Sequence, residues 1–167
     1  PGVGNLLGKR LIDRFKTPQN VFQASVEKLL QVDGVTERHV AAIKNHKMPW
    51  KVKAELDLLA RKEYRIITLA DPDYPRLLRE IPDPPPFLYV SGRLDSSALK
   101  IAVVGSRNAT GYGLTTTKHL CAGLASLGIT IISGMARGID TAAHEGAMAG
   151  GGKTIAVLGS GLERIYP

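Results

Sequence analysis

The apolar runs IAVV at residues 101–104, ITII at 129–132 and TIAVL at 154–158 decide the fold of this 167-residue chain. Each run is short, rich in β-branched side chains and followed at once by glycine or serine. Such runs are typical of parallel strands that are buried on both faces of a sheet. Helical patterns fill the gaps, at about residues 113–127 and 140–148. The sequence therefore predicts a βαβαβ unit with right-handed crossovers, in the α/β fold class.

Two further parts are expected before this unit. Residues 1–63 have apolar side chains at helical spacing, which predicts a small all-α domain of two helical hairpins and a last helix at about Trp50–Glu63. The apolar residues of that helix are expected to face inward: Val52, Leu56, Leu59 and Ala60. Residues 64–100 are rich in proline, which predicts a linker that ends in an edge strand, Phe87–Val90.

Residues 101–167 are expected to form the N-terminal part of an open, Rossmann-like parallel sheet. Sheets of this kind usually continue for several more strands, so the sheet is expected to be incomplete here. The first residue is proline rather than methionine, and Pro1-Gly2-Val3-Gly4 resembles a turn that lacks its preceding helix. The chain is therefore expected to be a fragment at both ends.

The turn at Pro1-Gly2-Val3-Gly4 and a second turn, Val32-Asp33-Gly34-Val35, resemble helix-hairpin-helix turns, whose backbone often meets DNA phosphates. Asp33 and Glu37 place negative charge near the second turn, which opposes contact with DNA there. A role in packing or in protein contacts is an equal alternative for this helical domain. The main DNA site is not expected here.

The charge of the chain, +7, suggests an anionic partner. Residues 1–63 hold 12 of the 22 Lys and Arg and 7 of the 15 Asp and Glu, so most of the excess is N-terminal. Charge alone does not distinguish nucleic acid from an acidic protein or a lipid surface. No apolar run approaches the ~20 residues of a membrane span, and no export leader is evident. The single cysteine, Cys121, fits a cytoplasmic location.

Small residues follow each predicted strand, as Gly105-Ser106-Arg107, SGMARG at 133–138 and GSG at 159–161. Ligands of open α/β sheets bind at the carboxyl ends of the strands, where glycine lets backbone amides approach a phosphate. Arg107 adds a guanidinium that can grip a phosphate through two hydrogen bonds, and Ser106 adds a hydroxyl. Alternatively, Arg107 pairs with a carboxylate and the glycines only form turns. We favour an anion site, and the predicted phosphate-binding residues are Gly105, Ser106, Arg107, Ser133, Gly134, Met135, Ala136, Arg137, Gly138 and Lys153.

Other residues that invite a chemical role are assigned structural ones. Asp140 could contact a ligand, but capping the helix that follows it, through amides two or three residues on, is favoured. His144 has no nucleophile or third metal ligand at a recognisable spacing, so no catalytic or metal site is predicted. Cys121 is expected to be a buried small hydrophobe rather than a reactive thiol. The glycines after residues 101–104 do not follow G-x-G-x-x-G, so no nicotinamide or other cofactor is expected.

Four sets of residues together resemble the DNA-processing protein A (DprA/Smf) family. They cover residues 64–167 closely, and the helical N-terminus more loosely resembles the sterile-alpha-motif-like or helix-hairpin-helix domain of that family. The sets are Tyr74-Pro75 with Leu77-Leu78, Ile81, Asp83, Pro85, Leu88-Tyr89 and Gly92; Gly105-Ser106-Arg107 with Tyr112-Gly113; Ser133 to Asp140 with Ala143-His144; and Thr154 to Gly161 with Tyr166-Pro167.

The resemblance implies a protein, not an enzyme, that binds single-stranded DNA without sequence preference, protects it and loads the RecA recombinase in natural transformation. It implies phosphate contacts at the loops of residues 105–107 and 133–138, and a homodimer formed through residues beyond Pro167. Aromatic residues are only 5% of the chain, so extensive base stacking is not expected and binding should be phosphate-led and sensitive to salt. The alternatives are a Rossmann-like enzyme of phosphoribohydrolase type that acts on nucleoside monophosphates, whose usual acid-and-arginine motif is not evident, and a protein-interaction scaffold.

Overall fold

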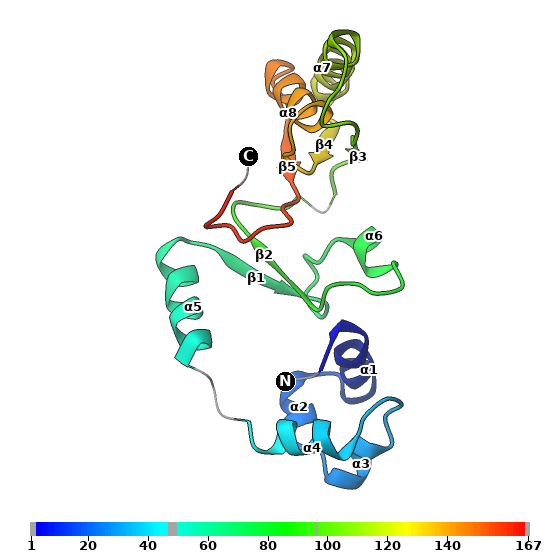
Figure 1. Ribbon diagram of the computed structural model, residues 1–167, viewed down its shortest axis with the longest axis vertical. Coiled ribbons are helices and arrows are strands. Elements are labelled where there is room, and N and C mark those ends of the chain that lie inside the picture. The colour runs from blue at the N-terminus through cyan, green and yellow to red at the C-terminus, as the bar shows by residue number, and fades with distance from the viewer. Residues whose placement is uncertain (1–2, 47–49, 96, 166–167) are drawn as a thin grey trace. The chain divides into compact units, whose positions relative to one another are not determined.

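The structure, a computed structural model, describes residues 3–46, 50–95 and 97–165. The chain forms two compact units, Pro1–Ser96 and Ser97–Pro167, which we call the N-terminal and C-terminal units (Figure 1). The break after Ser96 precedes the third strand, whereas the predicted division has breaks after residues 63 and 100. That three-part division stays a prediction.

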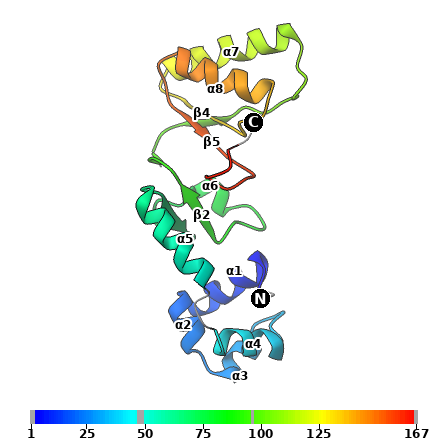
Figure 2. The same cartoon turned by 60° about the vertical axis from the view of Figure 1, so that its left-hand side comes forward.

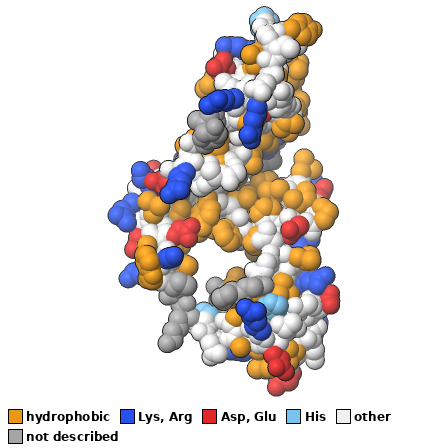
Figure 3. Space-filling view, viewed as in Figure 1, with side chains coloured by type: hydrophobic (Ala, Val, Ile, Leu, Met, Phe, Trp, Pro, Cys, Tyr) orange, Lys and Arg blue, Asp and Glu red, His pale blue; other side chains and the backbone are white. Residues whose placement is uncertain are grey.

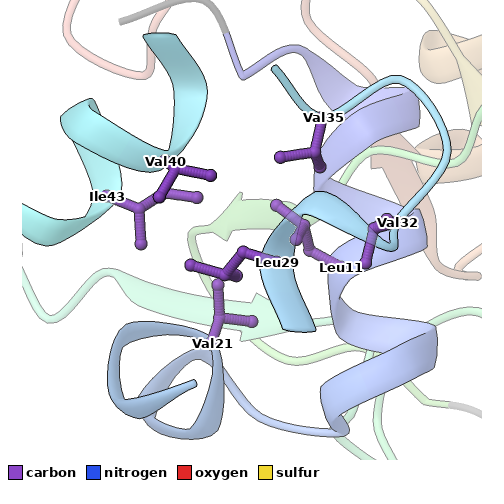
Figure 4. Packing of buried hydrophobic residues seen from close by; sticks show 7 residues of the cluster. All are labelled: Leu11, Val21, Leu29, Val32, Val35, Val40 and Ile43. Atoms are coloured by element: carbon purple, nitrogen blue, oxygen red, sulfur yellow. The ribbon is translucent and has the colours of Figure 1, made fainter. Parts of the chain in front are cut away.

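Four short helices form the first part of the N-terminal unit: α1 (Asn5–Phe15), α2 (Pro18–Gln23), α3 (Val26–Leu30) and α4 (Glu37–Lys44). Thr17 and Pro18 stop α1 and also start α2, because the Thr17 hydroxyl accepts a hydrogen bond from the Asn20 amide at 3.2 Å and Pro18 lies at the first helical position. One apolar cluster holds these helices together: Leu11, Val21, Leu29, Val32, Val35, Val40 and Ile43 (Figure 4).

The helix α5 (Trp50–Arg61) has the predicted position but not the predicted buried face. Leu59 is buried, whereas Val52, Leu56 and Ala60 are exposed, so the prediction that they face inward is wrong. The half-buried residue of this helix, Leu58, is next to Leu59. Amphipathic spacing shows which side chains share a face, and here only the C-terminal end of that face is covered.

Residues 65–90 form a small structure of their own. Strand β1 (Arg65–Thr68) pairs antiparallel with β2 (Phe87–Val90), and the short helix α6 (Arg76–Arg79) lies between them in sequence. Ile67, Tyr74 and Val90 form its buried core, and the Tyr74 hydroxyl donates to the Pro85 carbonyl at 2.7 Å. The strand β2 is thus confirmed, but it belongs to a separate two-stranded sheet, and β1 and α6 were not predicted.

The C-terminal unit is the predicted α/β fold. It contains β3 (Lys100–Ala102), α7 (Gly111–Ser126), β4 (Thr130–Ser133), α8 (Ile139–Ala149) and β5 (Thr154–Ala156). The three strands are parallel in the order β3-β4-β5. Because both crossovers lead in the same direction across the sheet, both helices lie on one face of it, where they pack against each other and against β4 (Figures 1 and 2).

The core of this unit lies between that face and the helices, and consists of Cys121, Ala125, Ile131, Ala143 and Ala147. The helices approach closely because Gly146 and Gly150 face the backbone of α7, and a Cβ atom at either glycine would collide with a carbonyl oxygen there. Burial of the strands on both faces holds only for β4. The strands β3 and β5 include exposed residues because they flank β4 in a sheet whose helices cover one face.

Among the described residues, no helix combines the length and the apolar character needed to cross a membrane.

Candidate anion-binding site

Two loops meet at the carboxyl ends of β3 and β4. We call residues 103–110 the first loop and residues 134–138 the second loop. The Ile139 amide donates a hydrogen bond to the Ser106 carbonyl at 3.2 Å, which links the start of α8 to the first loop. Gly138 has a φ of +81°, and a Cβ atom there would collide with the Ser106 carbonyl oxygen and lie 2.8 Å from that of Arg107. The loops therefore lie in direct backbone contact, and only glycine fits at residue 138.

The Ile139 side chain, at the start of α8, packs against the first loop. A Cβ atom on Gly105 would lie 2.7 Å from Cγ1 of Ile139, so the glycine is needed for this contact. A Cβ atom on Gly113, in the first turn of α7, would lie 3.7 Å from Cδ1 of the same residue. One apolar side chain thus joins the first loop, α7 and α8. Sequence reasoning missed Ile139, although an apolar residue directly after Gly138 is a signal for it.

The first loop presents several unused hydrogen-bond donors. Within the described parts of the chain, the backbone amides of Gly105, Ser106 and Arg107 have no acceptor. The Ser106 hydroxyl oxygen accepts from the Asn108 amide at 3.1 Å, which leaves its own proton free to donate. The Arg107 side chain is exposed and, among residues 3–46, 50–95 and 97–165, makes neither an ion pair nor a hydrogen bond. The alternative in which Arg107 pairs with a carboxylate is therefore not what the structure shows.

Two donors that the sequence assigned to phosphate binding, the Ser133 hydroxyl and the Ala136 amide, are committed to the protein itself. The Ser133 side chain is 2% exposed, and its hydroxyl donates to the Val103 carbonyl at 2.7 Å, which ties β4 to the first loop. The Ala136 amide donates to Oδ2 of Asp140 at 3.2 Å. The Ser133 hydroxyl and the Ala136 amide therefore hold the loops in place and are not available to a ligand. Met135, at the turn of the second loop, has a left-handed φ of +59°.

Asp140 does not have the predicted capping role. The N-cap of α8 is Gly138, and the Asp140 carboxylate points back to the amide of Ala136 instead of forward along the helix. Gly134 makes room for it, since a Cβ atom there would lie 2.9 Å from Oδ2. Asp140 is 7% exposed and its carboxylate holds the second loop, so the Ala136 amide is not available to a bound anion.

Arg137 is the exposed cation of the second loop. It makes no ion pair or hydrogen bond within the described residues, and it lines a surface groove of about 510 Å³ between α7 and α8. Lys118 and Glu145, paired at 3.1 Å, lie on opposite walls of the groove. The surface of this unit shows basic side chains next to hydrophobic ones (Figure 3).

Lys153 lies away from the other predicted site residues. It directly precedes β5, and its carbonyl accepts from the Ile131 amide near the start of β4. In a parallel sheet this is the edge opposite to the loops that follow the strands. The structure thus does not bring Lys153 together with Arg107, and we leave it out of the site.

The third small-residue loop follows β5 and is next to the second loop. The Val157 amide donates to the Ser133 carbonyl at 2.8 Å, which places the start of this loop beside Gly134. Gly159, Ser160 and Gly161 are exposed. Three loops therefore lie along one edge of the sheet, and Arg107 and Arg137 supply the positive charge of the first two.

His144 and Cys121 have structural positions. Nδ1 of His144 lies 2.6 Å from the Thr154 hydroxyl oxygen, which itself donates to the Ile131 carbonyl, so Nδ1 carries the proton of the neutral ring. Burial lowers the pKa of His144, and the nearby Asp140 carboxylate opposes this shift. Cys121 is fully buried, as predicted, and burial raises the pKa of its thiol.

The second helix-hairpin-helix-like turn is occupied by a contact within the N-terminal unit. Arg10 Nη1 lies 2.7 Å from the Asp33 carboxylate and 3.0 Å from its carbonyl oxygen, next to Gly34, whose φ is +84°. In the first turn, Pro1 and Gly2 lie outside the described residues. Of the two acidic residues predicted to oppose DNA at the second turn, Asp33 is paired with Arg10.

Comparison with known proteins identifies the family. The family model for DNA recombination-mediator protein A matches residues 65–167. Protein Smf of a Synechocystis species is 40% identical over 174 residues, covering 99% of this chain and 43% of the relative. DNA processing protein DprA of Streptococcus pneumoniae is 43% identical over 107 residues, covering 64% of this chain and 38% of the relative. The chain thus spans less than half the length of these curated relatives.

Solved structures agree with the sequence matches. The X-ray structure of DprA from Streptococcus pneumoniae has a TM-score of 0.62 at 33% identity, covering 98% of this chain and 60% of that one. DNA processing protein A from Helicobacter pylori, solved for its single-stranded DNA binding mode, has a TM-score of 0.55 at 34% identity, covering 63% of this chain and 46% of that one. With a family model over most of its length, the chain belongs to the DNA recombination-mediator protein A family, which includes the DprA and Smf proteins.

Proposed function

We propose that the C-terminal unit binds single-stranded DNA without sequence preference, with a backbone phosphate held at the first loop. The observation that carries the proposal is the exposed, unpaired guanidinium of Arg107 beside three free backbone amides and the Ser106 hydroxyl. A guanidinium and successive free backbone amides supply the positive charge and the hydrogen-bond donors that a phosphate requires. To Arg137, which is exposed on the loop in contact with this one, we assign a neighbouring phosphate.

The lack of sequence preference follows from the kind of donors at this edge. Amides, a hydroxyl and two guanidiniums recognise phosphate oxygens, which are identical at every nucleotide. No Asp or Glu side chain among the described residues pairs with either arginine, so both charges remain available for an anion. The relative from Helicobacter pylori, solved for its single-stranded DNA binding mode, supports this choice of partner.

We extend the proposal to the cellular role that family membership suggests. The bound strand would be protected from degradation and handed to RecA during recombination in natural transformation, by a protein acting as a homodimer. The chain supplies the strand-binding edge for this role, and it spans 43% of its Synechocystis relative. Exclusion of RecA from the protein–strand complex in a pull-down with purified components would contradict this extension.

An enzyme that cleaves nucleoside monophosphates is not the function we propose. Such chemistry needs an acid or base that can reach the substrate. Asp140, the acidic residue at the start of α8 beside the two loops, is 7% exposed, and its carboxylate accepts from the amide of Ala136. Incubation with a panel of nucleotides should release no free base, and released base would favour the enzyme over the binder.

The test of the proposal is a salt titration of DNA binding by the full chain and its Arg107→Ala variant. Loss of a charge-assisted hydrogen-bonding group should weaken binding to a thymidine oligomer roughly 10- to 100-fold at low salt, which corresponds to about 1.5–3 kcal/mol. The slope of log affinity against log salt should also fall by about 0.7, the value for one phosphate of a single strand.

The variant Arg93→Ala is a matched control, because Arg93 is also exposed but lies in the N-terminal unit. It should leave both the affinity and the slope nearly unchanged. Arg107→Lys should fall between wild type and Arg107→Ala, since it keeps the charge and loses the planar fork. Equal affinities of Arg107→Ala and the wild type at low salt would overturn the assignment of Arg107.

A further inference from the structure

Tyr112 is an aromatic side chain in an unusual position. It lies in the first turn of α7 and is 81% exposed. It is also the single Phe, Tyr or Trp in the sequence between residues 97 and 165, so the described part of the C-terminal unit has its aromatic ring on the surface instead of in the core. Tyr112 and the buried Cys121 are nine residues apart on α7, which puts them on opposite sides of the helix. No contact with the core explains the ring.

The turn that carries Tyr112 is anchored beside the candidate phosphate site. Thr110 caps α7, and its hydroxyl accepts from the Gly113 amide at 3.2 Å, which fixes the turn that carries Tyr112. Gly113 and Gly105 both face the Ile139 side chain, since a Cβ atom added to Gly113 would lie 3.7 Å from Cδ1 of Ile139 and one added to Gly105 would lie 2.7 Å from its Cγ1. Tyr112 therefore projects from a rigid turn whose next residue shares a packing partner with the loop of Arg107.

We propose that Tyr112 stacks on an unpaired nucleobase of the strand whose phosphate Arg107 holds, and that this contact makes the site prefer single-stranded to double-stranded DNA. This inference rests on the proposed function. Phosphates are present on both kinds of DNA, so the first loop alone gives no reason for such a preference. The face of a base is open to an aromatic ring only when the base is unstacked and unpaired. Stacking on one base requires one aromatic ring, so the low aromatic content of the chain does not argue against this contact.

The experiment measures binding of the full chain and its Tyr112→Ala variant to three probes at one salt concentration: a thymidine oligomer, an abasic oligomer of equal length and a duplex. The variant should bind the thymidine oligomer roughly 5- to 100-fold more weakly, the range expected from loss of one stacked base. Binding to the abasic oligomer and to the duplex should not change. The variant should therefore lose most of the preference for the thymidine oligomer over the other two probes.

Two variants control for the nature of the contact. Tyr112→Phe keeps the ring and should bind as the wild type does. Leu127→Ala removes a 77% exposed side chain from the end of α7 and should have no effect on any probe. Tyr112→Trp is made together with Trp50→Phe, so that the chain contains one indole. The fluorescence of this indole should be quenched by the thymidine oligomer and not by the abasic one.

The outcomes separate this inference from the proposed function. If Tyr112→Ala keeps the wild-type affinities for all three probes while Arg107→Ala loses them, the stacking role is refuted and the phosphate site stands. If Tyr112→Ala weakens binding to the abasic oligomer as much as to the thymidine oligomer, stacking is likewise refuted. If the wild-type chain binds none of the probes, both proposals fail.

Discussion

Gly138→Ala should open the contact between the two loops and so remove the anion site without removing any donor from it. The backbone of Gly138 has a φ of +81°, which is strained for alanine by about 1–3 kcal/mol. In addition, the new Cβ atom would collide with the carbonyl oxygen of Ser106 and lie 2.8 Å from that of Arg107. Neither oxygen is at the end of a flexible side chain, so the first loop itself must move by several tenths of an ångström or more.

Two effects are expected from this displacement. The free energy of unfolding should fall by about 2–4 kcal/mol, from the strained φ together with the displaced backbone contact. Affinity for a thymidine oligomer should fall at least ~10-fold, because bidentate phosphate binding depends on the placement of the amides and the guanidinium relative to each other. Urea unfolding followed by circular dichroism gives the first quantity, and fluorescence anisotropy of a labelled oligomer, measured well below the unfolding transition, gives the second.

Gly128→Ala is the matched control for backbone strain. Gly128 has a φ of +82°, almost that of Gly138, and open space where its Cβ atom would be. This variant should lose about 1 kcal/mol of stability and keep its affinity for DNA. If Gly138→Ala binds the oligomer as tightly as Gly128→Ala does, contact between the loops is not what forms the site, and our reasoning about the two loops is refuted.

Three further predictions concern the interior of the C-terminal unit. Ser133→Ala should lower the free energy of unfolding by about 1–3 kcal/mol, since it leaves the Val103 carbonyl without its donor. The affinity for DNA should stay within about twofold of the wild-type value. A large loss of affinity in the folded variant would mean that Ser133 contacts the ligand. Cys121 should react with a thiol reagent only as fast as the protein unfolds, because the thiol is fully buried and its pKa is raised; rapid modification of the native protein at pH 8 would contradict this. The free energy of unfolding should fall as the pH drops below 6.5, by at most about 1.4 kcal/mol per pH unit. The reason is that the pKa of His144 is lowered in the folded protein, so the unfolded chain binds the proton more tightly. His144→Gln should flatten this part of the stability–pH curve, and an unchanged curve would exclude His144 as the source of the pH dependence.

Local patterns were sufficient to place most elements of the C-terminal unit. The apolar runs at residues 101–104, 129–132 and 154–158 each overlap a strand, and the helices between them begin within two residues of their predicted starts. Strand periodicity, glycine and proline act over a few neighbouring residues, so they can be interpreted without knowing the fold. Topology rules then put the loops of all three strands on one edge, and Arg107 with them.

Contacts between distant residues could not be predicted in this way. Ser133 reaches the carbonyl of Val103, thirty residues away, and the role of its hydroxyl depends on the register of β3 and β4. Asp140 shows the same limit over a shorter separation. An aspartate at this position could cap α8 or accept from the Ala136 amide four residues before it, and the sequence does not distinguish these two roles. The covered part of α5 likewise depends on what packs against it, not on its spacing of leucines.

The sequence by itself thus determined the α/β class and the order of strands and helices of the C-terminal unit, and the loop that presents Arg107, because these follow from short-range periodicity and from where glycine is tolerated. Only the tertiary structure decided which donors of that edge are free. The Ser133 hydroxyl and the Ala136 amide form hydrogen bonds within the protein, and Lys153 lies at the opposite end of the strands. Arg107, Arg137 and Tyr112 are exposed. The physical reason is that hydrogen-bond satisfaction and burial are properties of residues that meet in space, whatever their separation along the chain.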